Sequence, residues 1–298
     1  MEEFFKKAIE KYGQSKVDQL IKAARSKENF YRIYKDLLKE EERKARINPP
    51  ITLIYGLPKS GKTAILNELA KQYKTKVLCM DKAGWLANNT SVVELPQHPI
   101  KMFEELKVQL SILNTFDEFE IEKLIIDNSS ELNEASLYYG TWLFMQTSMG
   151  KNLNRANGKL LPMAEWQLVT DGVLSKGGGW RYPREAIIDL MDNYIRPVSY
   201  KMDTIIVGHV KDKEIEENGK KINAKSLNMF GKTADLLMAK VDCPVLFRRK
   251  GKKGYFQFQY DDNETVAGSR YDRGDQLIIS EMTNEGLKTY WNDFYKTN

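Results

Sequence analysis

The sequence predicts an α/β fold in which a mostly parallel central sheet follows a small helical extension. From residue 51 onward, short apolar runs alternate with amphipathic helical segments, which is typical of a parallel sheet covered by helices on both faces. The residues before position 48 show only helical spacing. Asn48-Pro49-Pro50 separates the two patterns, so we expect a helical extension over 1–48 and an α/β domain over 49–298.

The expected elements follow from the period of the apolar residues. The strands are expected at 51–55, 76–80, 123–126, 204–207, 244–248 and 255–260. The helices of the α/β domain are expected at 63–73, 103–113, 131–149, 184–194 and 226–240. The extension is expected to hold helices at 4–12, 17–24 and 29–46. Two long connections remain: a loop over 150–183 and a charged hairpin over 211–225.

Composition excludes several classes of protein. The 298 residues carry 46 Lys plus Arg against 41 Asp plus Glu, a net charge of +5, and only two Cys and two His. That count excludes a disulfide framework, leaves little for a His/Cys metal site and fits a reducing compartment. No apolar run approaches the roughly 18 residues that span a bilayer, and the charged N-terminus does not resemble a signal peptide. We therefore expect a cytoplasmic protein with no membrane partner.

One motif carries the predicted chemistry. The run from Gly56 to Thr63 matches G-x-x-x-x-G-K-[ST] and stands between an apolar strand and a helix. In such a P-loop the backbone N–H groups and the helix N-terminus bind phosphate, Lys62 reaches the β- and γ-phosphates, and the Thr63 hydroxyl ligates Mg²⁺. The expected cofactors are ATP and Mg²⁺. The expected nucleotide-binding residues are Gly56, Pro58, Lys59, Ser60, Gly61, Lys62, Thr63 and Ala64.

Four further polar residues are candidates for the reaction, together with Lys62. Asp127 ends the strand 123–126 and could be the second Mg²⁺ ligand, although strand ends also carry Asp as a turn cap. Asp81 and Glu131 could each orient the attacking water, and a structural or capping role is equally open for both. His209 ends the strand 204–207. It could sense the γ-phosphate or serve as a local hydrogen-bonding residue.

The order of these motifs resembles that of a known family. The P-loop, the strand ending in Asp127, Gly208-His209 and the tail Arg270–Arg273 are similar to bacteriophage RecA-like ATPases, in particular to the Sak-type group implicated in single-strand annealing and recombination. The resemblance covers about residues 50–275. It implies a RecA-like P-loop NTPase core, ATP at the carboxyl edge of the sheet, and DNA bound by loops after later strands. For a phage protein, the cytoplasm would be that of a bacterial host.

The chain departs from that family in two places. Relatives often carry Asp-x-Glu-Gly after the second strand, with the Glu activating water, and here the stretch is Asp81-Lys82-Ala83-Gly84. Ala83 cannot act as a base, so that role would pass to Asp81 or Glu131. The helical extension is also not part of the core pattern. It suggests a subunit contact, and hence a homo-oligomer such as a ring or filament, or another partner.

Cations near the later strands are candidates for contacts with a nucleic acid or a neighbouring subunit. Cations interleaved with aromatic rings suit single-stranded DNA. The segment 209–254 is basic, with twelve Lys and Arg and six Asp and Glu. The candidates for single-stranded DNA are Arg155, Trp180, Arg181, Arg248, Arg249 and Lys250. Arg270 and Arg273 are candidates for arginine fingers. A solvated lid, a solvated turn and surface ion pairs are the structural alternatives.

Three functions remain open. The first is an ATP-binding, ATP-hydrolysing and DNA-binding protein of phage recombination, single-strand annealing or replication. The second is a nucleotide or other small-molecule kinase, for which Arg155, Arg181 and Arg184 would form a lid. The third is a nucleotide-binding interaction protein that does not hydrolyse ATP, which the Ala at position 83 favours.

Overall fold

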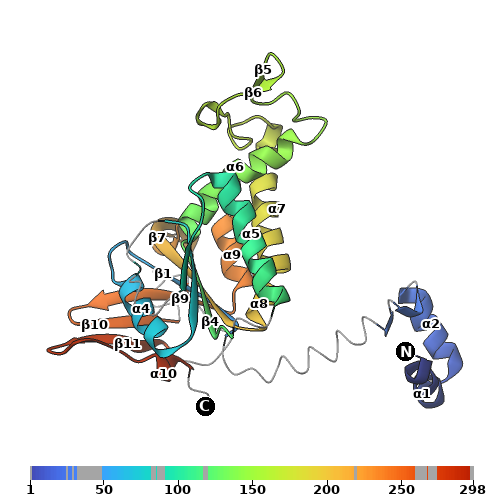
Figure 1. Ribbon diagram of the computed structural model, residues 1–298, viewed down its shortest axis with the longest axis horizontal. Helices are drawn as coiled ribbons and strands as arrows, with labels where there is room; N and C mark the ends of the chain where they lie inside the picture. Colours follow the sequence, from blue (N-terminus) through green and yellow to red (C-terminus); the bar gives the residue numbers. More distant parts are fainter. Residues whose placement is uncertain are drawn as a thin grey trace. The chain divides into compact units, whose positions relative to one another are not determined.

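A computed structural model of the chain is shown in Figure 1. It describes residues 2–24, 26–28, 30–31, 49–81, 85, 91–116, 120–217, 220–258, 267 and 274–295. The chain divides into two compact units, residues 1–47 and 48–298. Each unit is described by itself.

The first unit contains two amphipathic helices, α1 (Glu2–Tyr12) and α2 (Gln14–Ala24). Phe5 and Val17 are buried, and the ring of Phe5 lies 5.1 Å from that of Phe4 and 5.8 Å from that of Phe30. The two helices agree with the sequence prediction. The predicted third helix, 29–46, lies outside the described residues apart from residues 30 and 31.

The second unit is built on one large central sheet, most of which is parallel. The described strands lie in the order β12-β11-β10-β9-β1-β7-β4-β2-β3, and β8 pairs with β7 alone. The six parallel strands are β1 (Ile51–Gly56), β2 (Thr75–Cys79), β3 (Ser91–Glu94), β4 (Lys123–Asp127), β7 (Asp203–Glu217) and β9 (Cys243–Lys250). Antiparallel pairing adds β8 (Lys220–Leu227), β10 (Lys253–Gln257), β11 (Gln276–Thr283) and β12 (Gly286–Thr289). The predicted α/β fold class, with a mostly parallel central sheet, is confirmed.

Alternating side chains of the strands build two separate apolar layers, because successive residues of a strand point to opposite faces. In β1, Leu53 and Tyr55 pack into one layer and Ile54 into the other. The first layer covers α5 (Pro99–Thr115), α6 (Ser129–Met145), α7 (Arg181–Leu190), the π-helical turn η3 (Met191–Ile195), α8 (Arg196–Ser199) and α9 (Thr233–Lys240). The second layer lies between the other face of the sheet and α4 (Lys62–Gln72) and α10 (Trp291–Tyr295). Figure 1 shows α5 to α9 grouped on one side of the sheet and α4 on the other.

The connection between α6 and α7 has more structure than the loop that the sequence predicts over 150–183. It contains the hairpin β5 (Arg155–Ala156) and β6 (Lys159–Leu160) and the 3-10 turns η1 (Met163–Glu165) and η2 (Ser175–Trp180). The buried Asn154 side chain holds the connection together, because it accepts from the N–H of Gln167 and donates to its carbonyl. Figure 1 shows β5 and β6 beyond the end of α6, away from the sheet.

Some predicted boundaries are wrong. The predicted helix 226–240 begins only at Thr233, because Ser226 and Leu227 are buried as the last residues of β8, paired with Lys211 and Val210. Here, pairing with a neighbouring strand prevails over a helix-like apolar spacing. The charged hairpin expected over 211–225 is confirmed by the pairing of β7 with β8.

The sequence also missed β3, β11, β12 and α10. Of the strand predicted at 255–260, residues 255–257 belong to β10, which begins two residues earlier; Phe258 follows the strand, and residues 259–260 lie outside the described part. Among the described residues, no helix combines the length and the apolar character that crossing a membrane requires.

Candidate nucleotide-binding site

The P-loop joins β1 to α4 at the carboxyl edge of the parallel strands. Gly61 precedes the helix with φ 103°, a left-handed conformation that glycine adopts at little cost. Gly56 is held against β9 so closely that a Cβ on it would lie 2.6 Å from the carbonyl oxygen of Phe247. Both glycines therefore fix the path of the loop, and α4 begins at Lys62 with its first backbone N–H groups at the loop.

The Lys62 ammonium is buried next to the loop that carries it. The residue is 5% exposed, and Nζ donates to the carbonyls of Gly56 at 3.0 Å and Leu57 at 2.9 Å. Burial lowers the pKa of Lys62 to about 8, and the nearby Asp127 carboxylate partly opposes that shift. Among the described residues, no carboxylate forms an ion pair with Nζ. The positive charge of Lys62 is therefore held by neutral carbonyl groups, which do not neutralise it.

His209 meets Lys62 from the neighbouring strand. β1 pairs with β7 in a register that sets Gly56 opposite His209, and Nδ1 of His209 lies 3.5 Å from Nζ of Lys62. Since the ammonium can only donate, Nδ1 accepts from it in the tautomer that carries the proton on Nε2. Burial, and then the charge of Lys62, lower the pKa of His209, which favours a neutral imidazole at pH 7.

Asp127 ends β4, one strand beyond β7. It is 6% exposed, and its Oδ2 accepts from the indole Nε1 of Trp85 at 2.9 Å. Burial raises the pKa of Asp127 to about 6, and the Asp81 carboxylate adds to the shift, while Trp85 and Lys62 oppose it. Because burial disfavours the ionised form of this carboxyl group, a cation bound next to it would stabilise that form.

The Asn128 side chain joins the Asp81 carboxylate to the backbone at the start of α6. Its Nδ2 donates to Oδ2 of Asp81 at 2.7 Å, and its Oδ1 accepts from the backbone N–H groups of Ser130 and Glu131 as the N-cap of α6. Burial is the first cause that raises the pKa of Glu131, followed by the charges of Glu134 and Asp81. The structure thus brings Asp81 and Glu131 to the same edge as Asp127, as the sequence predicts.

The site also contains polar atoms without hydrogen-bond partners. Among the described residues, the buried hydroxyls of Ser60, Ser129 and Ser130 have none. Ser60 lies in the P-loop, and the other two open α6 directly after Asp127 and Asn128. A buried hydroxyl group without a hydrogen-bond partner costs free energy. A polar ligand at this edge of the sheet would supply such partners.

Thr63 and Asp127 are suitable donors for Mg²⁺. The cation prefers hard oxygen ligands and usually binds one or two protein groups together with phosphates and water. No group of three His, Cys, Asp or Glu able to hold a metal occurs in the described part of the chain, so a metal here would depend on the nucleotide for its other ligands. Thr63 follows Lys62 in the first turn of α4 and is half-buried, while Ala64 and Lys59 are exposed.

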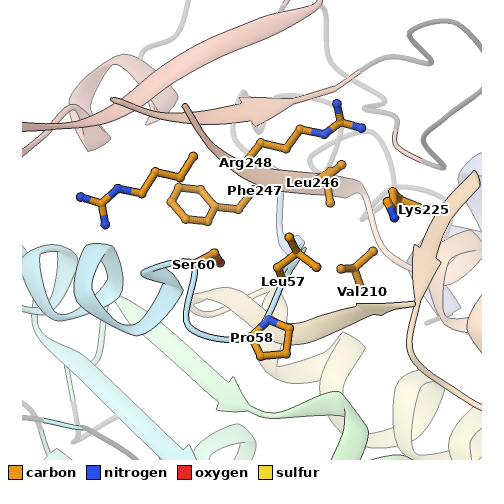
Figure 2. A pocket seen from close by; sticks show the side chains of 9 residues that line it. Leu57, Pro58, Ser60, Val210, Lys225, Leu246, Phe247 and Arg248 are labelled. Carbon is orange, nitrogen blue, oxygen red and sulfur yellow. The ribbon is translucent and has the colours of Figure 1, made fainter. Parts of the chain in front are cut away.

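A cavity of about 440 Å³ adjoins the P-loop on the side of β9. Figure 2 shows Leu57, Val210 and Leu246 around it, with Lys225 and Arg248 at its margin. The remaining lining residues are Pro58, Ser60, Phe247 and Arg249. Its volume falls in the range of small-molecule sites, about 300–1,000 Å³, and its walls are mainly apolar.

The residues predicted to contact nucleic acid do not form a single group. Arg248 and Arg249 of β9 line the P-loop cavity, and Lys250 follows them, exposed, at the end of the strand. Arg155 is exposed on β5, beyond the end of α6 (Figure 1). Arg181, exposed at the start of α7, donates to Glu185 at 2.6 Å.

Trp180 was predicted to bind nucleic acid and meets an aromatic ring from another loop. Its ring centroid lies 6.3 Å from that of Phe230, which follows β8 and is 47% exposed. The two candidate arginine fingers, Arg270 and Arg273, and the departure at Ala83 lie outside the described residues.

Sequence reasoning missed Trp85 altogether. The residue stands alone in the chain segment after β2, with no periodic pattern around it, and only the fold brings its indole to Asp127. Sequence reasoning also did not indicate that Arg249 lines the cavity beside the P-loop, because a basic run alone does not show what it faces. The contact of Arg249 with DNA stays a prediction.

No family model matches the chain, and no curated protein matches it. Among solved structures, the chain is similar to the crystal structure of the flagellar accessory protein FlaH from Methanocaldococcus jannaschii. The two share 12% identity, the match covers 84% of this chain and 95% of that chain, and the TM-score is 0.38. A likeness at that level says nothing about function.

Proposed function

We propose that this chain is a RecA-like ATPase that binds Mg-ATP at its P-loop. The observation that carries the proposal is the buried Lys62 ammonium, held by neutral carbonyls, toward which His209 and Asp127 converge from two other strands. A phosphate chain would supply the negative charge that Lys62 lacks, with Mg²⁺ held by Thr63 and Asp127. The apolar cavity beside the loop would take the nucleoside.

Isothermal titration calorimetry with ATP tests this proposal. Wild-type chain should bind ATP in the presence of Mg²⁺ and more weakly in EDTA, while Lys62→Ala should lose at least about 100-fold in affinity, as expected for a buried charged donor. Lys71→Ala is the matched control, because it removes the same charge from the exposed last turn of the same helix, where Lys71 pairs with Glu68. Equal affinity of wild type and Lys62→Ala would refute the proposal.

Hydrolysis requires a group that orients water, and Asp81 and Glu131 are both at the site. Asp81→Asn and Glu131→Gln should be compared for ATP turnover and for ATP affinity. The variant that loses turnover while keeping affinity identifies the water-activating residue. Tight ATP binding by wild type with no turnover, with or without DNA, would instead select the non-hydrolysing alternative, and phosphate transfer to a nucleoside or nucleotide would select the kinase.

We also propose single-stranded DNA as a partner, and the Trp180–Phe230 pair supports it. Two rings from different loops lie 6.3 Å apart, and Phe230 exposes nearly half of its surface. Bases stack on such rings with little dependence on sequence, at about 1–3 kcal/mol per base. Arg181, exposed next to Trp180, could neutralise phosphates there. A role in phage recombination or annealing rests on this partner, and a homo-oligomeric ring or filament remains a proposal of the same kind.

Fluorescence anisotropy with a labelled oligo(dT) strand tests the partner. Phe230→Ala should weaken binding about tenfold or more, and affinity should fall as salt rises, with a log–log slope near −0.7 for each phosphate contact. Phe116→Ala is the matched control, because Phe116 is also 47% exposed but lies at the end of α5. If Phe230→Ala and Phe116→Ala bind alike, the stacking surface is not at Phe230.

A further inference from the structure

Arg249 lies beside the P-loop of its own chain because β9 continues past the end of β1. The two strands run parallel, with Tyr55 opposite Leu246, so residues 247–250 extend beyond the last paired residue of β1. The close approach of Gly56 to the Phe247 carbonyl fixes this end of β9 against the start of the loop. The position of Arg249 is therefore set by the sheet rather than by a free loop.

Strand alternation decides which side of the sheet Arg249 takes. Phe247 packs in the same apolar layer as Ile65 and Leu66 of α4, while Leu246 packs in the opposite layer. Arg249 is two residues beyond Phe247 and so projects to the side of α4. A Cβ built on Gly61 would lie 3.8 Å from Nη1 of Arg249, which places the guanidinium within contact distance of the loop.

The charges around this guanidinium favour an anion. Among the described residues, no hydrogen bond or ion pair engages Arg249, and the side chain is exposed. The Lys62 ammonium is a second positive charge at the same loop, and it too forms no ion pair among the described residues. Arginine presents a planar set of donors that suits phosphate oxygens, and the N-terminus of α4, where phosphate binding is expected, starts directly after Gly61.

We propose that Arg249 binds, within the same chain, the phosphate chain of the nucleotide held at the P-loop. The proposal rests on the proposed Mg-ATP site and adds to it a residue that the sequence assigned to DNA. Arg249 closes the site from β9, opposite the strands β7 and β4 that bring His209 and Asp127.

Calorimetric titration with ATP in the presence of Mg²⁺ tests the contact. Arg249→Ala should weaken ATP binding about tenfold, the effect expected of a charge-assisted hydrogen bond at an exposed side chain, and Arg249→Lys should bind with intermediate affinity. Lys252→Ala is the matched control, because Lys252 is an exposed cation in the turn after β9, and its affinity should stay within about twofold of wild type, since distant exposed charges are screened.

Mixing subunits tests whether the contact lies within one chain. Lys62→Ala chains keep Arg249 but should not bind ATP themselves, so added in excess to Arg249→Ala they could supply Arg249 only from a neighbour. The affinity of Arg249→Ala should stay weak in the mixture, and its restoration would overturn the same-chain contact.

Two further outcomes would overturn the proposal. One is wild-type ATP affinity in Arg249→Ala. The other is a loss of oligo(dT) binding alone, which would return Arg249 to a DNA role. In both, wild type binds ATP and Lys62→Ala does not, so the proposed function stands while this inference fails. If wild type itself binds no ATP, both fail.

Discussion

Two buried lysines at opposite edges of the same sheet differ in the groups that surround their ammonium ions. Lys123 begins β4 at the amino edge and is 6% exposed, and Lys62 lies at the carboxyl edge and is 5% exposed. Nζ of Lys123 contacts Oδ2 of Asp203 at 2.5 Å and lies 3.6 Å from the ring centroid of Tyr295 and 4.6 Å from that of Tyr73. Among the described residues, the polar groups within hydrogen-bond distance of Nζ of Lys62 are two carbonyls and an imidazole nitrogen, and the Asp127 carboxylate acts through its charge without forming an ion pair.

We propose that this difference separates a structural lysine, Lys123, from a lysine that serves the proposed nucleotide site, Lys62. A buried ammonium with a carboxylate and two aromatic faces is satisfied by the folded chain itself. Lys62 is held by neutral acceptors, burial lowers its pKa to about 8, and the charge of the nearby Asp127 carboxylate opposes that shift only in part. Replacing each lysine by methionine, which has a similar length and no charge, is the most direct way to test the contrast.

The largest effect is expected for Lys123→Met. The change leaves the Asp203 carboxylate without its cation at a position where the Asp203 side chain is 21% exposed, and breaking a buried ion pair costs about 3–5 kcal/mol. Partial exposure places the expected loss in the free energy of unfolding near 3 kcal/mol. Urea denaturation measures it, and ATP affinity should remain at the wild-type value at low urea. A stability equal to wild type would show that the pair is not structural.

Lys62→Met should show the reverse. ATP affinity should fall about 100-fold, because a charged donor to phosphate is lost. The free energy of unfolding should change by less than about 1 kcal/mol, since removing a poorly solvated charge offsets the loss of two hydrogen bonds. Calorimetry and urea denaturation on the same preparation check both values. A loss of several kcal/mol in stability would place Lys62 with Lys123 as a structural lysine.

Asp127→Asn extends the contrast to the carboxylate. The pKa of Asp127 is raised from 3.8 to about 6, so the folded chain binds more protons than the unfolded chain between these values. The free energy of unfolding of wild type should therefore fall by up to about 3 kcal/mol as pH rises from 4 to 6. The Asn variant should lack this fall and be more stable than wild type at pH 7, while Mg²⁺ no longer improves its ATP affinity. Denaturation across this pH range measures the slope.

The smallest effect concerns pH above neutrality. Because the pKa of Lys62 in the free chain is lowered to about 8, the ammonium loses its proton above that pH, and phosphate binding must then restore it. ATP affinity should be level between pH 7 and 8 and fall by up to about tenfold per pH unit from 8 toward 10. An affinity that stays constant up to pH 10 would show that Lys62 is not poised in this way.

The sequence by itself determined the glycine-lysine loop from Gly56 to Thr63, the α/β class and the strand ends that carry Asp81, Asp127 and His209. Each of these is a local pattern: a glycine-lysine spacing, an alternation of apolar runs, and a polar residue directly after a buried strand. Parallel strands bring such residues to one edge whatever their order in the sheet, so their placement at that edge could be predicted before the strand order was known.

Only the tertiary structure decided which groups meet at that edge. The order β9-β1-β7-β4 brings His209 to Lys62 and Arg249 to Gly61. The fold likewise delivers Trp85 to Asp127 and pairs Lys123 with Asp203, whereas among the described residues no carboxylate forms an ion pair with Lys62 and Asp127 acts on it through its charge alone. These are contacts between residues far apart in the chain, and no local spacing encodes them. The sequence shows where a charged residue lies in the chain. The packing of other strands around that residue decides whether it gains a partner of opposite charge.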